Sequence, residues 1–141
     1  MYKNILIGID GSKQAKQAFE VGCNLAKVLS AKVSLLWVVN RDRSMDVSFG
    51  VGAEFYQDVA DQAKEKIKPY QDAAKEKGVE VKAEVLIGNV KEVLSDTYPK
   101  EHQIDLIVIG QTGMNSIEKV VVGSHTSYVV RNSACDVLVV K

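Results

Sequence analysis

The stretch from Asp105 to Thr126, DLIVIGQTGMNSIEKVVVGSHT, combines residue types that can bind phosphate. It begins with a continuous apolar run at 106–109, which is typical of a buried parallel strand, and the run breaks at Gly110. Gly113 follows after two residues, and the pair Gly123-Ser124 follows after nine more. Glycines let the backbone turn tightly and approach a ligand, and a Gly-Ser pair at a helix start offers N–H groups and a hydroxyl. We therefore interpret the stretch as a cradle for a nucleotide phosphate.

Two better-known phosphate-binding signatures do not occur in the sequence. No Gly-Lys-Ser/Thr follows the glycines, so the stretch is not a Walker A loop, and the dinucleotide fingerprint G-x-G-x-x-G is found nowhere in the chain. Each glycine taken alone could serve an ordinary turn. Three glycines with Ser124 and Thr126, directly after a buried strand, are more specific than any one of them.

Apolar strand-like segments alternate with amphipathic helical segments along the whole chain. This alternation predicts an α/β fold with parallel strands joined by right-handed crossovers. Strands are expected at Ile5–Ile9, Lys32–Val39, Val79–Ile87, Leu106–Ile109 and Val137–Val140, and helices after an N-cap at Ser12, at Glu54–Lys77, from Asn89 to about Tyr98, near Ser116–Val121 and at Ser124–Asn132.

Four segments lead to local expectations. Asn40–Ala53 has a weak pattern and two glycines, so a long loop is expected there. Pro69 lies inside a helical pattern and predicts a kink or a break in that helix. Pro99 is expected to end the third helix. Val79–Ile87 alternates in polarity, which favours an edge strand.

Length and charge narrow the class of protein. The 141 residues are expected to form one domain, and the balance of 18 basic and 18 acidic residues argues against nucleic-acid binding. Cys23 and Cys135 are isolated and fit no metal-ligand spacing, which favours buried free thiols in a reducing compartment. The first apolar run is too short for a signal peptide, and no segment is long enough to span a membrane, so a cytoplasmic location is expected.

Polar residues follow several of the expected strands. Ligands of an open parallel sheet bind at the carboxyl ends of its strands, where Asp10, Asn40 and Gly110 are expected to lie. Asp10 could accept hydrogen bonds from a ribose or help to hold magnesium through water, and it could equally cap the first helix. Asp105 and Asp136 precede strands, so they are expected at the opposite edge as turn residues.

The spacing of the glycines and both ends of the chain resemble a known family. Gly110-x2-Gly113-x9-Gly123-Ser124 matches the G-x2-G-x9-G-(S/T) motif of the ATP-binding branch of the universal stress protein family. Residues 5–12 (ILIGIDGS) are similar to that family's first strand and turn, and residues 133–141 (SACDVLVVK) to its last strand. The resemblance covers the whole chain. It implies an open five-stranded parallel sheet of order 3-2-1-4-5 with helices on both faces, the Rossmann-like fold of the adenine nucleotide alpha hydrolases.

The resemblance also implies a ligand and the residues around it. The ligand would be ATP, with Mg²⁺ or Mn²⁺ as an optional companion, at the carboxyl edge of the sheet. Asp10 would contact the ribose, and Val38 would contact the adenine with Gly8 and Ile9 close by. The ribose and phosphates would be surrounded by Ile109, Gly110, Gly113, Gly123, Ser124, His125 and Thr126. His125 departs from the family pattern, in which small apolar residues are common at its position.

Two functions remain open at this point. The resemblance implies an ATP-binding regulatory protein without catalytic residues, whose nucleotide alters its dimer, its partners or its stability. The alternative is a slow ATPase or other nucleotide hydrolase, for which only Asp10 and His125 could act as acid or base. Lys119 is the only Lys or Arg in the glycine-rich stretch, whereas phosphoryl transfer needs a cationic clamp. Efficient hydrolysis is therefore not expected.

A Ser-His-Asp hydrolase built on Ser124 is disfavoured. Ser124 and His125 are adjacent at a helix start, which does not bring their side chains together, and the G-x-S-x-G elbow does not occur. His102 precedes the fourth strand and is expected at the edge opposite the ligand.

The last strand, Val137–Val140, is a continuous apolar run at the end of the sequence. The resemblance implies a homodimer formed through this strand. Pairing with a second copy would cover an apolar sheet edge that is otherwise prone to association. ATP and a second copy of the chain are thus the expected partners, with neither nucleic acid nor membrane.

Overall fold

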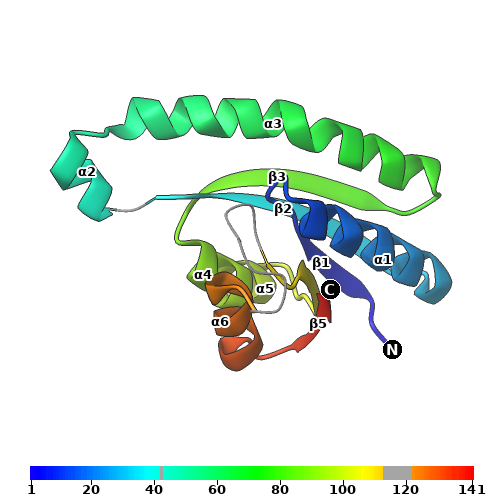
Figure 1. Ribbon diagram of the computed structural model, residues 1–141. Coiled ribbons are helices and arrows are strands. Elements are labelled where there is room, and N and C mark those ends of the chain that lie inside the picture. Colours follow the sequence, from blue (N-terminus) through cyan, green and yellow to red (C-terminus); the bar gives the residue numbers. More distant parts are fainter. Residues whose placement is uncertain (42, 113–121) are drawn as a thin grey trace.

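The computed structural model describes residues 1–41, 43–112 and 122–141, which form an open sheet flanked by helices (Figure 1). The strands are β1 (Asn4–Gly8), β2 (Lys32–Asn40), β3 (Val81–Gly88), β4 (Leu106–Gly110) and β5 (Asp136–Val140). Their order across the sheet is β3-β2-β1-β4-β5, and every neighbouring pair is parallel. The fold class and the strand order expected from the sequence are confirmed.

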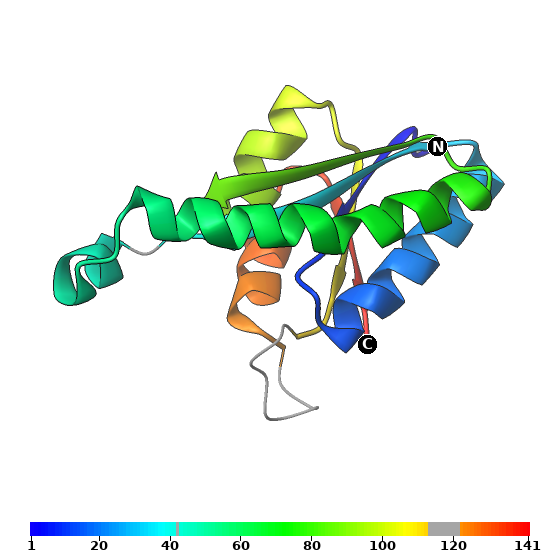
Figure 2. The ribbon, with the colours of Figure 1, turned by 90° about the horizontal axis from the view of Figure 1, so that it is seen from above.

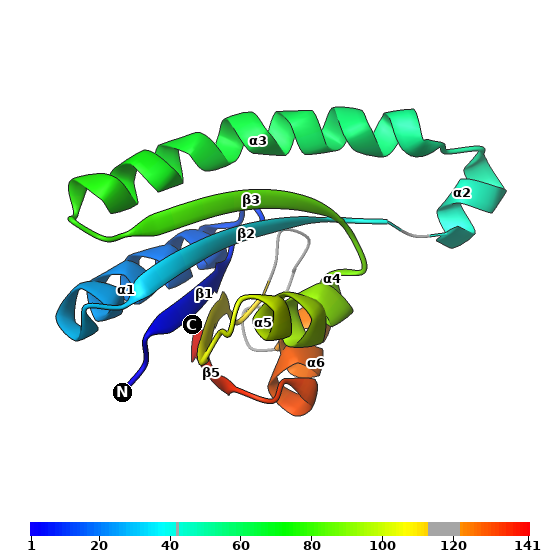
Figure 3. The same cartoon turned by 180° about the vertical axis from the view of Figure 1, so that it is seen from behind.

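Helices cover both faces of this sheet, as Figures 1 and 3 show from opposite sides. One face carries α1 (Lys13–Leu29) and α3 (Ala53–Glu76), and α2 (Arg43–Phe49) lies beyond the sheet beside the start of α3. The other face carries α4 (Val90–Glu92), the π-helical turn η1 (Val93–Thr97), α5 (Tyr98–Glu101) and α6 (Ser124–Asn132). Seen from above, α3 runs along the sheet over β2 and β3 (Figure 2).

Two apolar cores lie on the two faces because side chains alternate along each strand. In β1, Ile5 and Ile7 pack with α1 on one face, whereas Leu6 packs with Tyr98 and Val129 on the other. The side chains of all three β1 residues are fully buried. The central strands are thus buried on both faces. The polar residues of the site come after the carboxyl ends of these strands.

The segment Asn40–Ala53 is not the long loop expected from the sequence. β2 extends to Asn40, and α2 occupies about half of the segment. The Asp46 carboxylate in α2 accepts hydrogen bonds from the Arg41 guanidinium at 3.0 Å and from the Tyr56 hydroxyl at 2.7 Å. These bonds tie α2 to the end of β2 and to the start of α3. The weak apolar pattern gave no sign of them because α2 buries none of its residues.

Pro69 does not break α3, which continues to Glu76. Apolar residues on both sides of the proline, Ile67 and Ala74, are buried against the sheet. Burial along the whole helix outweighs the lost backbone hydrogen bond. Of the two outcomes expected at Pro69, the break is wrong and the kink stays a prediction.

The sequence suggested that Pro99 ends the third helix at about Tyr98, but the helix does not end there. The helical path continues to Glu101 through η1, in which the Tyr98 N–H donates to the Val93 carbonyl five residues earlier. A π-helical turn carries one extra residue, and this changes the hydrogen-bond pattern just before the proline, whose own nitrogen has no hydrogen to donate. The helix therefore passes the proline and buries Tyr98 against the sheet.

Candidate functional site

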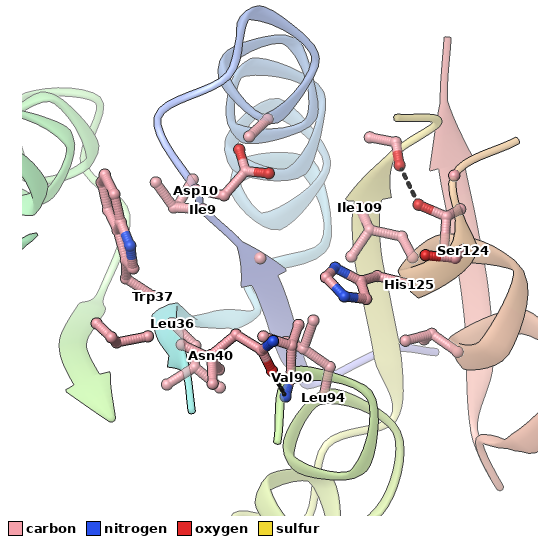
Figure 4. Close-up of a pocket in the computed structure, with 18 of the residues that line it drawn as sticks. Ile9, Asp10, Leu36, Trp37, Asn40, Val90, Leu94, Ile109, Ser124 and His125 are labelled. Atoms are coloured by element: carbon pink, nitrogen blue, oxygen red, sulfur yellow. Dashed lines mark hydrogen bonds between the residues drawn. The ribbon is translucent and has the colours of Figure 1, made fainter. Parts of the chain in front are cut away.

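A cavity of about 1240 Å³ opens at the carboxyl ends of β1, β2 and β4 (Figure 4). Its walls come from these strand ends, from the start of α3, from α4 and η1, and from α6. The carboxyl edge is where open parallel sheets bind their ligands, and the volume is ample for a mononucleotide.

The β2 side of the cavity is apolar. Leu36 and Val38 line it from one face of the sheet, and Trp37 lines it from the other face together with Tyr56 of α3. Both faces contribute because the strand ends inside the cavity wall and its side chains alternate. An apolar and aromatic surface of this kind suits a planar group such as a purine ring.

Asp10 follows β1 after one residue, Ile9, and its carboxylate lines the middle of the cavity (Figure 4). One carboxylate oxygen accepts the Ser12 N–H at 2.9 Å, and Gly11 adopts a left-handed φ of 83°, so the chain turns sharply into α1. The N-cap of α1 is Ser12, as expected, because its hydroxyl accepts the Ala15 N–H at 3.0 Å. Asp10 therefore holds the turn without capping the helix, and its carboxylate also faces the cavity.

The N-terminus of α6 faces the cavity from the β4 side. Gly123 is its N-cap and makes no side-chain hydrogen bond to the first turn. The first N–H groups of a helix have no partner inside it, so those of Ser124 and His125 are available to a ligand. Their partial positive charge attracts anions. This end of the cavity suits phosphate.

The end of β4 is fastened to α6 and lies close to α1. The Thr126 hydroxyl donates to the Gly110 carbonyl at 2.8 Å, and the Gly123 N–H donates to the Gln111 carbonyl at 2.8 Å. A Cβ at Gly110 would lie 2.8 Å from the Cβ of Gln14 in α1. The first glycine of the motif is thus required by the packing of α1. The Thr126 hydroxyl proton is thus used inside the protein.

His125 projects its imidazole into the cavity beside Ile109 (Figure 4). Partial burial and the nearby Lys91 ammonium lower the pKa of His125 from its usual value, and the Asp10 carboxylate opposes this effect. Because that usual value is about 6.5, the imidazole is mainly neutral at pH 7. Lys91 belongs to α4, and its ammonium lies 5.6 Å from the ring centre of Tyr128 in α6.

All expected site residues that the structure describes line this one cavity. They are Gly8, Ile9, Asp10, Val38, Ile109, Gly110, Gly123, Ser124, His125 and Thr126. Gly113, Lys119 and the short helix expected at Ser116–Val121 lie outside the described residues. Binding of a ligand by the cavity residues stays a prediction.

A comparison with models of protein families matches residues 1–141 to the universal stress protein family. The chain belongs to the universal stress protein family. A putative universal stress protein of Staphylococcus haemolyticus is 34% identical over 141 residues, which cover 99% of this chain and 85% of the relative.

Solved universal stress proteins share the fold described above. The universal stress protein UspA from Lactobacillus plantarum is 35% identical with a TM-score of 0.84, over 99% of this chain and 98% of that one. A universal stress protein solved in complex with cAMP is 24% identical with a TM-score of 0.73, over 99% of this chain and 97% of that one. One from Archaeoglobus fulgidus solved with dAMP is 17% identical with a TM-score of 0.73, over 99% and 98% of the two chains. At these last two identities the likeness shows the fold alone.

The opposite edge of the sheet holds the aspartates that were expected there. The Asp105 carboxylate accepts the N–H groups of Lys3 at 2.8 Å and Asn4 at 3.1 Å, which fixes the entry into β1. The Asp136 carboxylate accepts the Tyr2 hydroxyl at 2.6 Å. Both aspartates join chain segments at the amino edge and do not reach the cavity.

No Ser-His-Asp triad is assembled in the part of the chain that the structure describes. The side chains of Ser124, His125 and Asp10 all line the cavity, but no hydrogen bond among the described residues joins them. His102 stacks on Tyr98 with 3.9 Å between ring centres, before β4 begins. The hydrolase interpretation therefore gains no support from geometry.

The cavity carries few groups for metal binding or phosphoryl transfer. Among the described residues, no cluster of three or more His, Cys, Asp or Glu could hold a metal ion. In the described lining, Asp10 is the only carboxylate, His125 is the only imidazole, and neither Lys nor Arg occurs. Binding of a nucleotide fits this set of side chains better than its rapid turnover does.

Sequence reasoning missed the contributions of α3 and α4. Phe55, Tyr56 and Val59 line the cavity from the start of α3, and their helical period indicated only a helix covering the sheet. The Asn40 side-chain oxygen accepts the Val90 N–H at 3.3 Å and so connects β2 to α4. These contacts depend on where helices cross strand ends, which no local pattern reveals.

The two thiols differ in burial. Cys23 is fully buried, and burial raises its pKa to about 11, whereas Cys135 is only half-buried. Both are free thiols, as expected, but the expectation of full burial is wrong for Cys135. In the ranges 1–41, 43–112 and 122–141, no helix is both long and apolar enough for a membrane crossing.

Proposed function

We propose that this chain binds ATP in the cavity at the carboxyl edge and serves as a nucleotide-responsive regulatory protein in stress tolerance. One observation carries the proposal: the apolar end of β2, the Asp10 carboxylate and the open N-terminus of α6 line one cavity (Figure 4). They follow one another in the order in which ATP presents its base, its ribose and its phosphates.

Each part of the ligand has a matching part of the wall. Adenine would lie against Val38, with Gly8 and Ile9 close by, and the ribose hydroxyls would donate to Asp10. The phosphates would be surrounded by Ile109, Gly110, Gly113, Gly123, Ser124, His125 and Thr126. Thr126 would contribute its backbone N–H, because its hydroxyl donates to Gly110.

Mg²⁺ or Mn²⁺ enters the proposal only as a companion of the nucleotide. Mg²⁺ commonly keeps several waters and is bound by one or two carboxylates together with substrate phosphates. The described lining, with Asp10 as its single carboxylate, fits a metal of this kind and not a dedicated protein cage. Such an ion would neutralise part of the phosphate charge.

Two lines of support come from outside the cavity. Universal stress proteins of the same fold bind cAMP and dAMP, which favours an adenine nucleotide as the ligand class. The motif Gly110-x2-Gly113-x9-Gly123-Ser124 favours ATP among them. Slow hydrolysis is the second candidate, because Asp10 and His125 both line the cavity and could assist a water molecule.

The test is to denature the purified protein, separate the released small molecules by chromatography and measure ATP binding by calorimetry with and without Mg²⁺. Stoichiometric ATP, or calorimetric binding at one site, is the expected result. Bound ADP with steady phosphate release on adding ATP would favour the hydrolase. If the protein releases no nucleotide and shows no calorimetric binding of ATP, the proposal is overturned.

Asp10→Asn separates the role in the turn from the role in binding. Asparagine keeps an oxygen that can accept the Ser12 N–H, so the fold should persist, while the charge facing the ribose is lost. Hydrogen bonds to a charged group are stronger by about 1 kcal/mol, so ATP binding should weaken roughly fivefold. Asp72→Asn, on the exposed face of α3, removes the same charge elsewhere and should leave affinity unchanged.

The proposal includes a homodimer formed through Val137–Val140. β5 is an edge strand, and its apolar residues are only half-buried in the single chain, so a second copy could cover them. Light scattering should give twice the mass of the chain, and a monomer at micromolar concentration would overturn this part. A cytoplasmic location, supported by free thiols at Cys23 and Cys135, is tested by cell fractionation.

A further inference from the structure

His125 is the second residue of α6, and its side chain is exposed within the cavity. Figure 4 shows the imidazole projecting from the first turn of α6 toward the middle of the cavity. A side chain that filled space in the core would be buried, whereas this one can be reached by a ligand. The ring is therefore placed as a contact group and not as packing material.

The His125 ring retains its hydrogen-bonding capacity. A neutral imidazole has one N–H donor and one acceptor nitrogen, and no described residue hydrogen-bonds either of them. The same end of the cavity offers the N–H groups at the start of α6, which no described side chain caps, and the exposed Ser124 side chain. The imidazole, the Ser124 hydroxyl and these N–H groups can all donate hydrogen bonds to a ligand. Donors of this kind suit the oxygens of a phosphate chain.

Two charged groups act on the His125 ring from different elements in the described part of the chain. Lys91 approaches from α4, where its ammonium lies over the Tyr128 ring of α6, and Asp10 approaches from the turn after β1. Lys91 is half-buried and lies outside the cavity lining, so its positive charge acts on the ring without itself lining the cavity. The phosphate end is thus more positive than the Asp10 side of the same cavity.

We propose that the His125 side chain is a specificity-determining contact for the phosphate chain of the nucleotide, with Lys91 adding positive charge from outside the cavity lining, so that the cavity favours ATP over AMP and adenosine. This inference rests on the proposed function and deepens it. Backbone N–H groups alone would bind phosphate equally well with any side chain at this position. The imidazole adds a donor that only a ligand with a phosphate chain long enough to reach it can use.

The test is calorimetric titration of the full chain with ATP, ADP, AMP and adenosine. His125→Val installs an apolar side chain, the kind common in the family at this position, and His125→Gln keeps a hydrogen-bond donor. His102→Gln is the matched control, because that histidine lies outside the cavity beside Tyr98. Thermal unfolding of each variant without nucleotide checks that it is folded.

His125→Val should weaken ATP binding roughly 10- to 100-fold, the usual effect of losing a hydrogen bond to a charged group. ADP should be affected less and adenosine not at all, while His125→Gln recovers most of the loss. Lys91→Gln should weaken ATP binding roughly two- to fivefold, and Lys100→Gln, an exposed control on α5, should not.

Equal affinities of wild type and His125→Val for ATP would overturn the inference while leaving the proposed function intact. Equal loss for ATP and adenosine would also overturn it, because the ring would then not distinguish ligands by their phosphates. A wild-type chain that binds none of the four ligands would overturn both the inference and the proposed function.

Discussion

Gly110→Ala should destabilise the protein through a clash with α1. The added Cβ would lie 2.8 Å from the Cβ, 2.9 Å from the carbonyl carbon and 3.0 Å from the carbonyl oxygen of Gln14, whereas ordinary contacts are 3.4–4 Å. Two of these three atoms belong to the backbone of α1. A change of side-chain rotamer cannot relieve the clash, so the helix and the end of β4 must move apart.

The expected cost depends on that movement. Overpacking of a well-packed site typically costs about 1–3 kcal/mol, and the need to shift a 17-residue helix places this case in the upper half of the range. For a chain of this length, the melting temperature should fall by roughly 4–12 °C. Urea unfolding monitored by circular dichroism gives the free energy of unfolding directly.

Gly88→Ala is the matched control, since Gly88 is the last residue of β3 as Gly110 is the last residue of β4. Its Cβ would meet only the Val93 side chain, at an ordinary 3.4 Å, so stability should change by less than about 0.5 kcal/mol. A Gly110→Ala variant as stable as the wild type would refute the packing argument. If that variant also lost ATP binding, the first glycine of the motif would serve the ligand alone.

The remaining predictions use single groups in and around the cavity. Trp37, the only tryptophan, lines the cavity, so its fluorescence should change in a saturable way on titration with ATP; constant emission at calorimetric saturation would place the base elsewhere. Cys135 should react with a thiol reagent at pH 8 well before Cys23. Cys23 is fully buried, and its pKa is raised to about 11. Equal reaction rates for the two thiols would contradict that burial. ATP affinity should rise as the pH falls from neutral into the acidic range, because the pKa of His125 is lowered in the free protein and a bound phosphate would favour the protonated imidazole. His125→Val should reduce this rise, and an identical pH profile for the variant would show that the ring does not take up a proton.

The fold was predictable because the local sequence pattern of most segments agrees with the place of that segment in the fold. The apolar run at 106–109 predicted a buried strand and forms β4 inside the sheet, and local chemistry dictates the N-cap at Ser12. Where the prediction was wrong, contacts between different elements decided the outcome. Asp46 ties α2 to the end of β2 and to α3 through bonds to Arg41 and Tyr56, and burial on both sides of Pro69 keeps α3 unbroken.

The site was predictable in position more than in the role of each residue. Strand ends and glycine spacing brought Asp10 and Ser124 to the same cavity. The close approach of Gln14 to Gly110 gives that glycine a packing role that spacing alone does not show. Lys91 comes near His125 only because α4 packs beside α6, and no spacing between positions 91 and 125 encodes that contact.

The two edges of the sheet are unequal, and this limits how far copies of the chain can add to one another. The β3 edge carries Lys82 and Glu84, whose side chains pair at 2.6 Å, while the β5 edge is the apolar run Val137–Val140. Charged residues on an edge strand discourage further pairing. A sheet with two apolar edges could grow at both ends into a filament. If copies of the chain pair through β5 as proposed, the charged β3 edge offers no second run of this kind, so growth by this route would stop at two copies.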